Sequence, residues 1–263
     1  MTRQNYYKQR QHRAREEVDE SLALKLIAQE RSRHPRIGAR KLLHLVGDEL
    51  REAGAEMGRD RFFALLRRKD LLIERRRKGV RTTRSQHGFT VYCNQAKDLE
   101  LVGVHQLWVS DITYIRTAEG FMFLSLVMDM FSRAIVGYDA SDSLEMEGAL
   151  RALSMAQKQL PSESRTMHHS DRGSQYCCGA YIAQLKSRQM LISMTEENHC
   201  YENACAERLN GIMKQEYGLG ETFGTKGQAR RAVKEAVSLY NDWRPHGALE
   251  NRIPMQVHRE FAA

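Results

Sequence analysis

The chain has 263 residues, 41% of them hydrophobic and 28% charged, which is typical of globular proteins and long enough to bury a sizeable core. It contains no run of about 18 apolar residues and no apolar stretch near its start, so neither a membrane-spanning helix nor a secretory signal peptide is expected. Five cysteines without CxxC spacing argue against a disulfide framework and predict a reducing, cytoplasmic location.

Positive charge is concentrated at the front of the chain. Residues 1–90 contain 23 Lys and Arg against 12 Asp and Glu, whereas residues 91–263 contain 18 against 21. This asymmetry indicates a module that binds a polyanion, with nucleic acid as the first candidate and an anionic membrane as the second. The alternative is a solvated basic surface.

Three amphipathic helices are predicted at the front, over about residues 17–31, 38–52 and 58–69, with a break at Ala53-Gly54-Ala55. Two short helices joined by a small-residue turn predict a helix-turn-helix DNA-binding module over residues 1–74, with a plain three-helix bundle as the alternative. The last helix presents four arginines outward, and these are candidate DNA contacts: Arg59, Arg61, Arg67 and Arg68. Residues 75–104 are predicted to be a basic linker.

The signals change to strands after residue 104. Five strands are expected at residues 108–115, 121–131, 134–140, 167–170 and 191–195, and helices are expected at 146–160, 179–189 and 203–217. Three strands joined by tight turns, followed by alternating helices and strands, predict an α/β fold in which helices flank a mixed five-stranded sheet. We place this domain at residues 105–220, with a C-terminal helical extension at 221–263.

Three carboxylates occupy informative positions in this arrangement. Asp111 interrupts an apolar strand, Asp171 closes the fourth strand, and Glu207 lies in the first turns of the last helix of the domain. A buried carboxylate is costly without compensation, although an exposed edge position would also explain Asp111. Side chains on these three elements can converge into an all-oxygen site for Mg²⁺ or Mn²⁺.

The chain resembles one known family in several ordered blocks. Thirty-five residues separate Asp171 from Glu207, as in DDE transposases and retroviral-type integrases, and the blocks WVSDITYI, VMDMFSRAIVGY, HSDRGSQY, CYENACAER and YNDWRPHGAL are similar to blocks of OrfB transposases of the bacterial insertion sequence 3 group. HPRIGARKL and GRDRFFALLRR are similar to the helix-turn-helix segment of that family. The sequence departs from the family at Glu202, Arg208, Cys177 and Cys178, none of which replaces a metal ligand.

The resemblance implies a ribonuclease-H-like, integrase-type catalytic core in which Asp111, Asp171 and Glu207 hold two Mg²⁺ ions, with Mn²⁺ able to substitute. It implies metal-dependent cleavage at the element ends and strand transfer by the 3′-hydroxyl. Lys214 stands seven residues beyond Glu207, where the family carries a basic residue, and two helical turns place both on one face. The alternative for Lys214 is an exposed helix lysine.

The resemblance also implies partners and a setting. Double-stranded DNA, as terminal inverted repeats and as target, is the expected partner, and we expect a homo-oligomer on DNA in the bacterial cytoplasm, associated with the nucleoid. The upstream-frame protein (OrfA) is a further expected partner, fused or separate; the initial methionine and the lack of a heptad zipper favour an unfused product. Alternative functions are a DNA-binding regulator whose core does not cut and a structure-specific nuclease with the same core.

Some residues remain open from the sequence. Arg172 follows the second carboxylate, where a DNA contact and an ordinary polar loop are both reasonable interpretations. His168 is predicted to be a packed strand histidine. The block from Tyr240 to His246 either braces the core or contacts transposon DNA.

Overall fold

A computed structural model describes residues 2–55, 57–74, 88–97, 99–161, 164–196 and 204–262. The chain divides into two compact units, residues 1–77 and residues 78–263. Residues 75–87 and 98 of the predicted basic linker lie outside the described residues, as do His199, Cys200 and Glu202.

The first unit is the expected all-α module. Helices α1 (Arg3–Arg33), α2 (Ala39–Glu52) and α3 (Arg59–Arg68) enclose a common apolar core. The core residues at helical spacing include Ala23, Leu26, Ile27, Leu42, Val46, Leu50, Phe62, Leu65 and Leu66. Gly54 adopts φ +74 directly after α2, a conformation that favours glycine and turns the chain toward α3.

The predicted start of the first helix was wrong. Apolar spacing placed it near residue 17, but α1 begins at Arg3. Residues 3–15 carry Arg, Lys and Gln, which favour helix by propensity without supplying an apolar stripe. The first half of α1 is therefore helical although it contributes nothing to the core.

The second unit contains a mixed sheet with the strand order β3-β2-β1-β4-β5. The strands are β1 (Leu107–Thr117), β2 (Gly120–Asp129), β3 (Ile135–Ser141), β4 (Met167–Ser170) and β5 (Leu191–Met194). β1 is antiparallel to β2 and parallel to β4. A sixth short strand, β6 (Thr222–Phe223), pairs with β1 and was not predicted.

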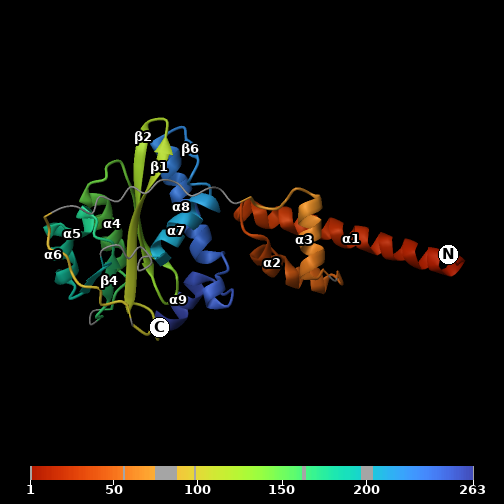
Figure 1. Ribbon diagram of the computed structural model, residues 1–263, viewed down its shortest axis with the longest axis horizontal. Coiled ribbons are helices and arrows are strands. Elements are labelled where there is room, and N and C mark those ends of the chain that lie inside the picture. The colour runs from red at the N-terminus through yellow and green to blue at the C-terminus, as the bar shows by residue number, and fades with distance from the viewer. Residues whose placement is uncertain are drawn as a thin grey trace. The chain divides into compact units, whose positions relative to one another are not determined.

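Helices cover both faces of this sheet, as Figure 1 shows. On one face α4 (Met146–Gln157), α5 (Ser174–Cys177) and α6 (Gly179–Ser187) pack over Trp108 and Val127. On the other face α7 (Ala204–Gln215) and α8 (Lys226–Asp242) pack over Val109 and Leu126. A Cβ on Gly137 would lie 2.1 Å from the carbonyl oxygen of Ala152, so glycine permits the close approach of β3 and α4. No helix in the described part of the chain has the length and apolar character needed to span a bilayer.

The C-terminal block braces the core. The chain continues from α8 through a short 3-10 helix (Gly247–Leu249) to α9 (Pro254–Ala262). Asn241 accepts from the backbone N–H of Ile135 and donates to its carbonyl, both at 2.9 Å. Arg244, 1% exposed, pairs with Glu216 through two hydrogen bonds of 2.8 and 2.9 Å. The structural role left open by the sequence is therefore present for Asn241 and Arg244.

Candidate active site

Asp111 lies at the point where β1 loses its neighbour on one side. β4 pairs with β1 only as far as the Ser110–Ser170 register pair, and β6 begins its pairing at Arg116. Asp111 is the first residue of β1 beyond β4, and on the other side it remains paired with Leu126 of β2. A carboxylate at the end of a strand pairing is within reach of side chains from the helices above the sheet.

Two hydrogen bonds hold the Asp111 carboxylate. The backbone N–H of Ile112 donates to Oδ1 at 2.8 Å, and the side-chain amide of Asn210 donates to Oδ2 at 2.8 Å. Burial, followed by the negative charge of Asp171 and, less strongly, that of Glu207, raises the pKa of Asp111 to about 7, although both hydrogen bonds lower it. Asp111 therefore interacts electrostatically with both of the other predicted carboxylates.

Asp171 follows β4 directly, so it leaves the sheet beside Asp111 on the neighbouring parallel strand. Its Oδ1 accepts from the backbone N–H of Gly173 at 2.9 Å. A Cβ on Gly173 would lie 3.0 Å from the same oxygen, so a larger residue would crowd the carboxylate. The Gly173 position thus fixes the orientation of Asp171.

Helix α7 supplies Glu207 and Lys214. Glu207 is exposed in its first turn, and Ala206, Leu209 and Met213 bury the opposite side of the helix. The Nζ atom of Lys214 lies 4.1 Å from the centroid of the Tyr114 ring, on β1. Burial lowers the pKa of Lys214, the charge of Arg116 lowers it further, and the charge of Asp111 opposes both. Lys214 is therefore half-buried beside the carboxylates, and the interpretation as an ordinary exposed lysine was wrong.

Comparisons with known proteins show the family of this chain. Residues 102–200 match the model of a family described as integrase core domain, and residues 188–254 match a second model of that description. Transposase InsF for insertion sequence IS3A of Escherichia coli (strain K12) is 35% identical over 218 residues, which are 82% of this chain and 76% of that protein. The chain belongs to the insertion sequence 3 family of transposases.

Two further similarities extend the comparison. An uncharacterized 31 kDa protein of insertion element IS600 from Shigella sonnei is 32% identical over 266 residues, 99% of this transposase and 96% of that protein. A chain in the simian T-cell lymphotropic virus intasome, solved in complex with PP2A regulatory subunit B56 gamma, is 16% identical with a TM-score of 0.51. That match covers 88% of this chain and 74% of the viral one, and it shows a shared fold. The expected ribonuclease-H-like core is thus confirmed.

The donor chemistry of the transposase site fits divalent cations. Asp111, Asp171 and Glu207 offer only carboxylate oxygens, which Mg²⁺ and Mn²⁺ prefer. The Oδ1 atom of Asn210 is buried and has no hydrogen-bond partner among the described residues, which leaves a further polar oxygen beside Asp111. Over those same residues, no three Asp, Glu, His or Cys side chains lie close enough together to hold a metal ion, and this includes Asp111, Asp171 and Glu207.

Four of the five predicted DNA-binding arginines make contacts within the protein. In the transposase's first unit, Arg61 pairs with Asp19 at 3.2 Å and Arg68 with Glu20 at 2.5 Å. Arg59 pairs with its neighbour Asp60, and Arg67 is exposed without an ion pair to any described residue. In the second unit, Arg172 donates from Nε to the carbonyl of Thr195 at 2.6 Å, which ties the loop after Asp171 to the end of β5.

Asn210 and Tyr114 were missed in the sequence. Asn210 lies three residues after Glu207 and four before Lys214, so the i, i+3, i+7 spacing along α7 could have identified it. Tyr114 carried no signal, because its contact with Lys214 joins a strand to a helix 100 residues later. His168 is buried as predicted, between the Ser110 and Tyr181 hydroxyls at 2.8 and 2.9 Å.

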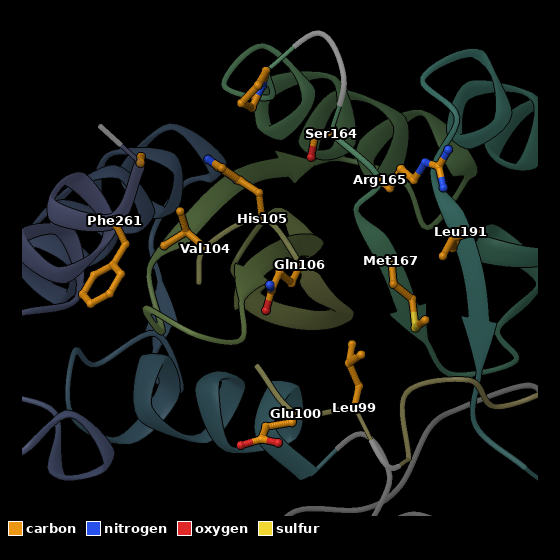
Figure 2. A pocket seen from close by; sticks show the side chains of 12 residues that line it. Leu99, Glu100, Val104, His105, Gln106, Ser164, Arg165, Met167, Leu191 and Phe261 are labelled. Atoms are coloured by element: carbon orange, nitrogen blue, oxygen red, sulfur yellow. The ribbon is translucent and has the colours of Figure 1, made fainter. Parts of the chain in front are cut away.

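One cavity of the second unit is separate from this site. It has a volume of about 630 Å³ and is lined by residues that include His105, Gln106, Met167 and Phe261 (Figure 2). Gln106 and Met167 stand at the beginnings of β1 and β4, whereas Asp171 follows the end of β4. The cavity therefore opens at the opposite end of these parallel strands.

Proposed function

We propose that this transposase cuts DNA at the ends of its element and joins the freed 3′-hydroxyl to another phosphate, with Asp111, Asp171 and Glu207 binding two divalent ions. The observation that carries this proposal is the position of Asp111 and Asp171 just beyond the Ser110–Ser170 register pair, under the helix that bears Glu207. Mg²⁺ is the expected ion, with Mn²⁺ as a substitute.

The bound ions would supply activation of a water and then of the 3′-hydroxyl, and stabilisation of the leaving oxygen. The side chains of the protein would position these groups. Asn210 and the Ile112 N–H orient the Asp111 carboxylate, Gly173 orients Asp171, and Lys214 would contact the phosphate beside the scissile bond. No serine or tyrosine nucleophile is needed, so no covalent protein–DNA intermediate is proposed.

The remaining parts of the proposal concern partners. The helical module of residues 1–74 would hold the terminal inverted repeats while the core of residues 105–220 carries out the chemistry. A homo-oligomer on DNA would bring two element ends together, and the upstream-frame protein (OrfA) would assist or be fused. Mass measurement of the complex with end DNA, with and without that protein, tests these points.

A single assay tests the reaction. The full chain is incubated with Mg²⁺ and a labelled element-end duplex, and joined strands are expected. Nicks without joining would identify a nuclease, and binding without any product would identify a regulator; either result overturns the proposal.

Charge-neutral variants assign the site. Asp111→Asn, Asp171→Asn and Glu207→Gln should each lower joining by at least about 10³-fold, because the ligands of a two-metal site act as a unit. Glu235→Gln, an exposed carboxylate on α8, is the control and should keep joining. Near-normal joining by any of the three site variants would show that the residue is not a ligand.

A further inference from the structure

Basic and acidic side chains occupy separate segments of helix α1. From Arg3 to Arg15 it carries five basic residues and no acidic one, the basic residues being Arg3, Lys8, Arg10, Arg13 and Arg15. From residue 16 to residue 20 it carries four acidic residues: Glu16, Glu17, Asp19 and Glu20. We call residues 3–15 the basic arm.

The acidic segment engages the arginines of α3. Arg61 donates to Asp19 and to the backbone carbonyl of Glu16, and Arg68 pairs with Glu20. These ion pairs fasten α3 to the middle of α1, and they neutralise two of the four arginines that a helix-turn-helix interpretation would assign to DNA. The positive charge of α3 is therefore partly used inside the module.

The basic arm has no such partners. Residues 2–15 are all exposed, and burial of α1 in its own unit begins only at Ala23. None of the five basic side chains makes an ion pair within the described ranges of the chain. Figure 1 shows the start of α1 extending past α2 and α3.

The arm presents basic and aromatic side chains together. At about 100° per residue, Arg3, Tyr7 and Arg10 lie on one side of the helix, with Tyr6 and Arg13 at its margin. The Arg3 guanidinium lies 6.0 Å from the Tyr7 ring centroid, and Tyr6 and Tyr7 are 54% and 49% exposed. Arg and Tyr are side chains that bind phosphate and sugar oxygens of DNA.

Electrostatics in the free protein disfavours this arrangement. Arg3 stands in the first turn of α1, where the positive end of the helix dipole repels a cation. Arg10 and Arg13 are like charges three residues apart, which repel each other on a helix surface. A row of phosphates would attract these cations and offset both repulsions. The electrostatic energy of the arm is therefore lower beside a polyanion than in water.

We propose that the basic arm of α1 binds the phosphate backbone of element-end duplex DNA. The inference rests on the proposed function, since it takes element DNA as the substrate. It adds an interaction surface within the module of residues 1–74 that precedes the helices predicted from the sequence.

The test measures duplex binding by the full chain without Mg²⁺, across a salt titration. The arm variant carries Arg3→Gln, Arg10→Gln and Arg13→Gln, which keep helix propensity. The control carries Arg40→Gln, Arg51→Gln and Lys69→Gln, three exposed basic residues of the same module, and removes the same charge. Circular dichroism verifies equal helix content.

The arm variant should bind duplex DNA at least about tenfold more weakly at a salt concentration of about 0.1 M. The slope of the logarithm of the binding constant against the logarithm of the salt concentration should be shallower by about 0.9 for each lost phosphate contact. Unchanged affinity, or an equal loss in the control, overturns the inference. Retained binding with a changed solution mass would identify the arm as an oligomerisation helix and also overturns it. Because the assay needs no Mg²⁺, failure of strand joining in the wild type would contradict the proposed function and leave this result standing.

Discussion

Asn210 lies one helical turn beyond Glu207 on α7, and its side-chain amide donates a hydrogen bond of 2.8 Å to Oδ2 of Asp111. The bond joins α7 to β1 at the carboxylate that interacts electrostatically with Asp171 and Glu207. It lowers the pKa of Asp111, against burial and the two neighbouring charges, and so favours the ionised form that binds a cation.

Replacement of Asn210 should therefore weaken metal binding. Asn210→Ala removes the donor, raises the pKa of Asp111 further, and should increase the Mg²⁺ concentration needed for half-maximal joining by about 10- to 100-fold, as loss of a ligand-orienting partner does. Joining across a Mg²⁺ titration is the measurement. Gln215→Ala replaces an exposed residue of the same helix and serves as the control. If both variants need the same Mg²⁺ concentration for half-maximal joining, Asn210 does not have the role given to it.

Lys214 should matter for DNA and not for metal. Its ammonium stands over the Tyr114 ring and can donate to a phosphate but cannot ligate a cation. Lys214→Ala should lower joining and binding of the terminal base pairs by about 10- to 100-fold, the value of a charged hydrogen bond, and leave the Mg²⁺ dependence unchanged. Lys214→Arg should retain much of the activity if charge is sufficient. Unaltered joining and end binding by Lys214→Ala would return the residue to a structural role.

Arg244 should be a stability determinant. Arg244→Leu removes the cation that pairs with the Glu216 carboxylate and leaves that negative charge uncompensated. The substitution should lower the free energy of unfolding by about 3–5 kcal/mol. Arg230→Leu, which breaks the exposed pair with Asp142, should cost less than about 1 kcal/mol. Urea unfolding of both variants separates the two cases, and equal losses would argue against a bracing role for Arg244.

His168 should make the core sensitive to acid. Burial, and then the charge of His169, lower the pKa of His168 to about 3, whereas an unfolded histidine titrates near about 6.5. Between these values the unfolded chain binds a proton that the folded chain does not, so stability is complete above about pH 6.5 and is lost as the pH falls toward 3, by at most about 1.4 kcal/mol per pH unit.

His168→Gln keeps an acceptor for the Ser110 and Tyr181 hydroxyls but cannot be protonated. Its stability at pH 7 should be lower, and its decline from pH 7 to pH 5 should be shallower than that of the wild type. Urea unfolding at several pH values checks this, with the exposed His44→Gln as control. Parallel curves for wild type and His168→Gln would exclude His168 as the source of acid sensitivity.

The sequence predicts elements well where local pattern determines them. The short strand predicted at 167–170 corresponds to β4 (Met167–Ser170), and the β-rich run at 108–115 lies inside β1 (Leu107–Thr117). Alternation and apolar runs report burial on a sheet directly, so the strands that carry Asp111 and Asp171 were predictable. The start of α1 was not, because a solvated helix has no apolar stripe to detect.

Contacts between distant residues carry no local signal. Asn210 and Asp111 are 99 residues apart, and nothing near either one indicates their bond. The ion pairs of Arg61 and Arg68 with α1 likewise span more than 40 residues, so arginines that appeared free on a helix surface are engaged. Helical periodicity predicts which side of a helix is polar, but it does not predict what that side faces.

The central position of β1 has a consequence for how the enzyme comes into being. β1 emerges early in synthesis, but β4, α7 and β6, which surround Asp111, emerge later, and α7 only after residue 204. Long-range pairings of this kind form late in folding. A chain interrupted before α7 therefore has the N-terminal helical unit and strands β1 to β5 but lacks Glu207 and Asn210. If the proposed site is correct, such a fragment would bind DNA without cutting it, and strand cleavage would be confined to chains that have been translated through α7.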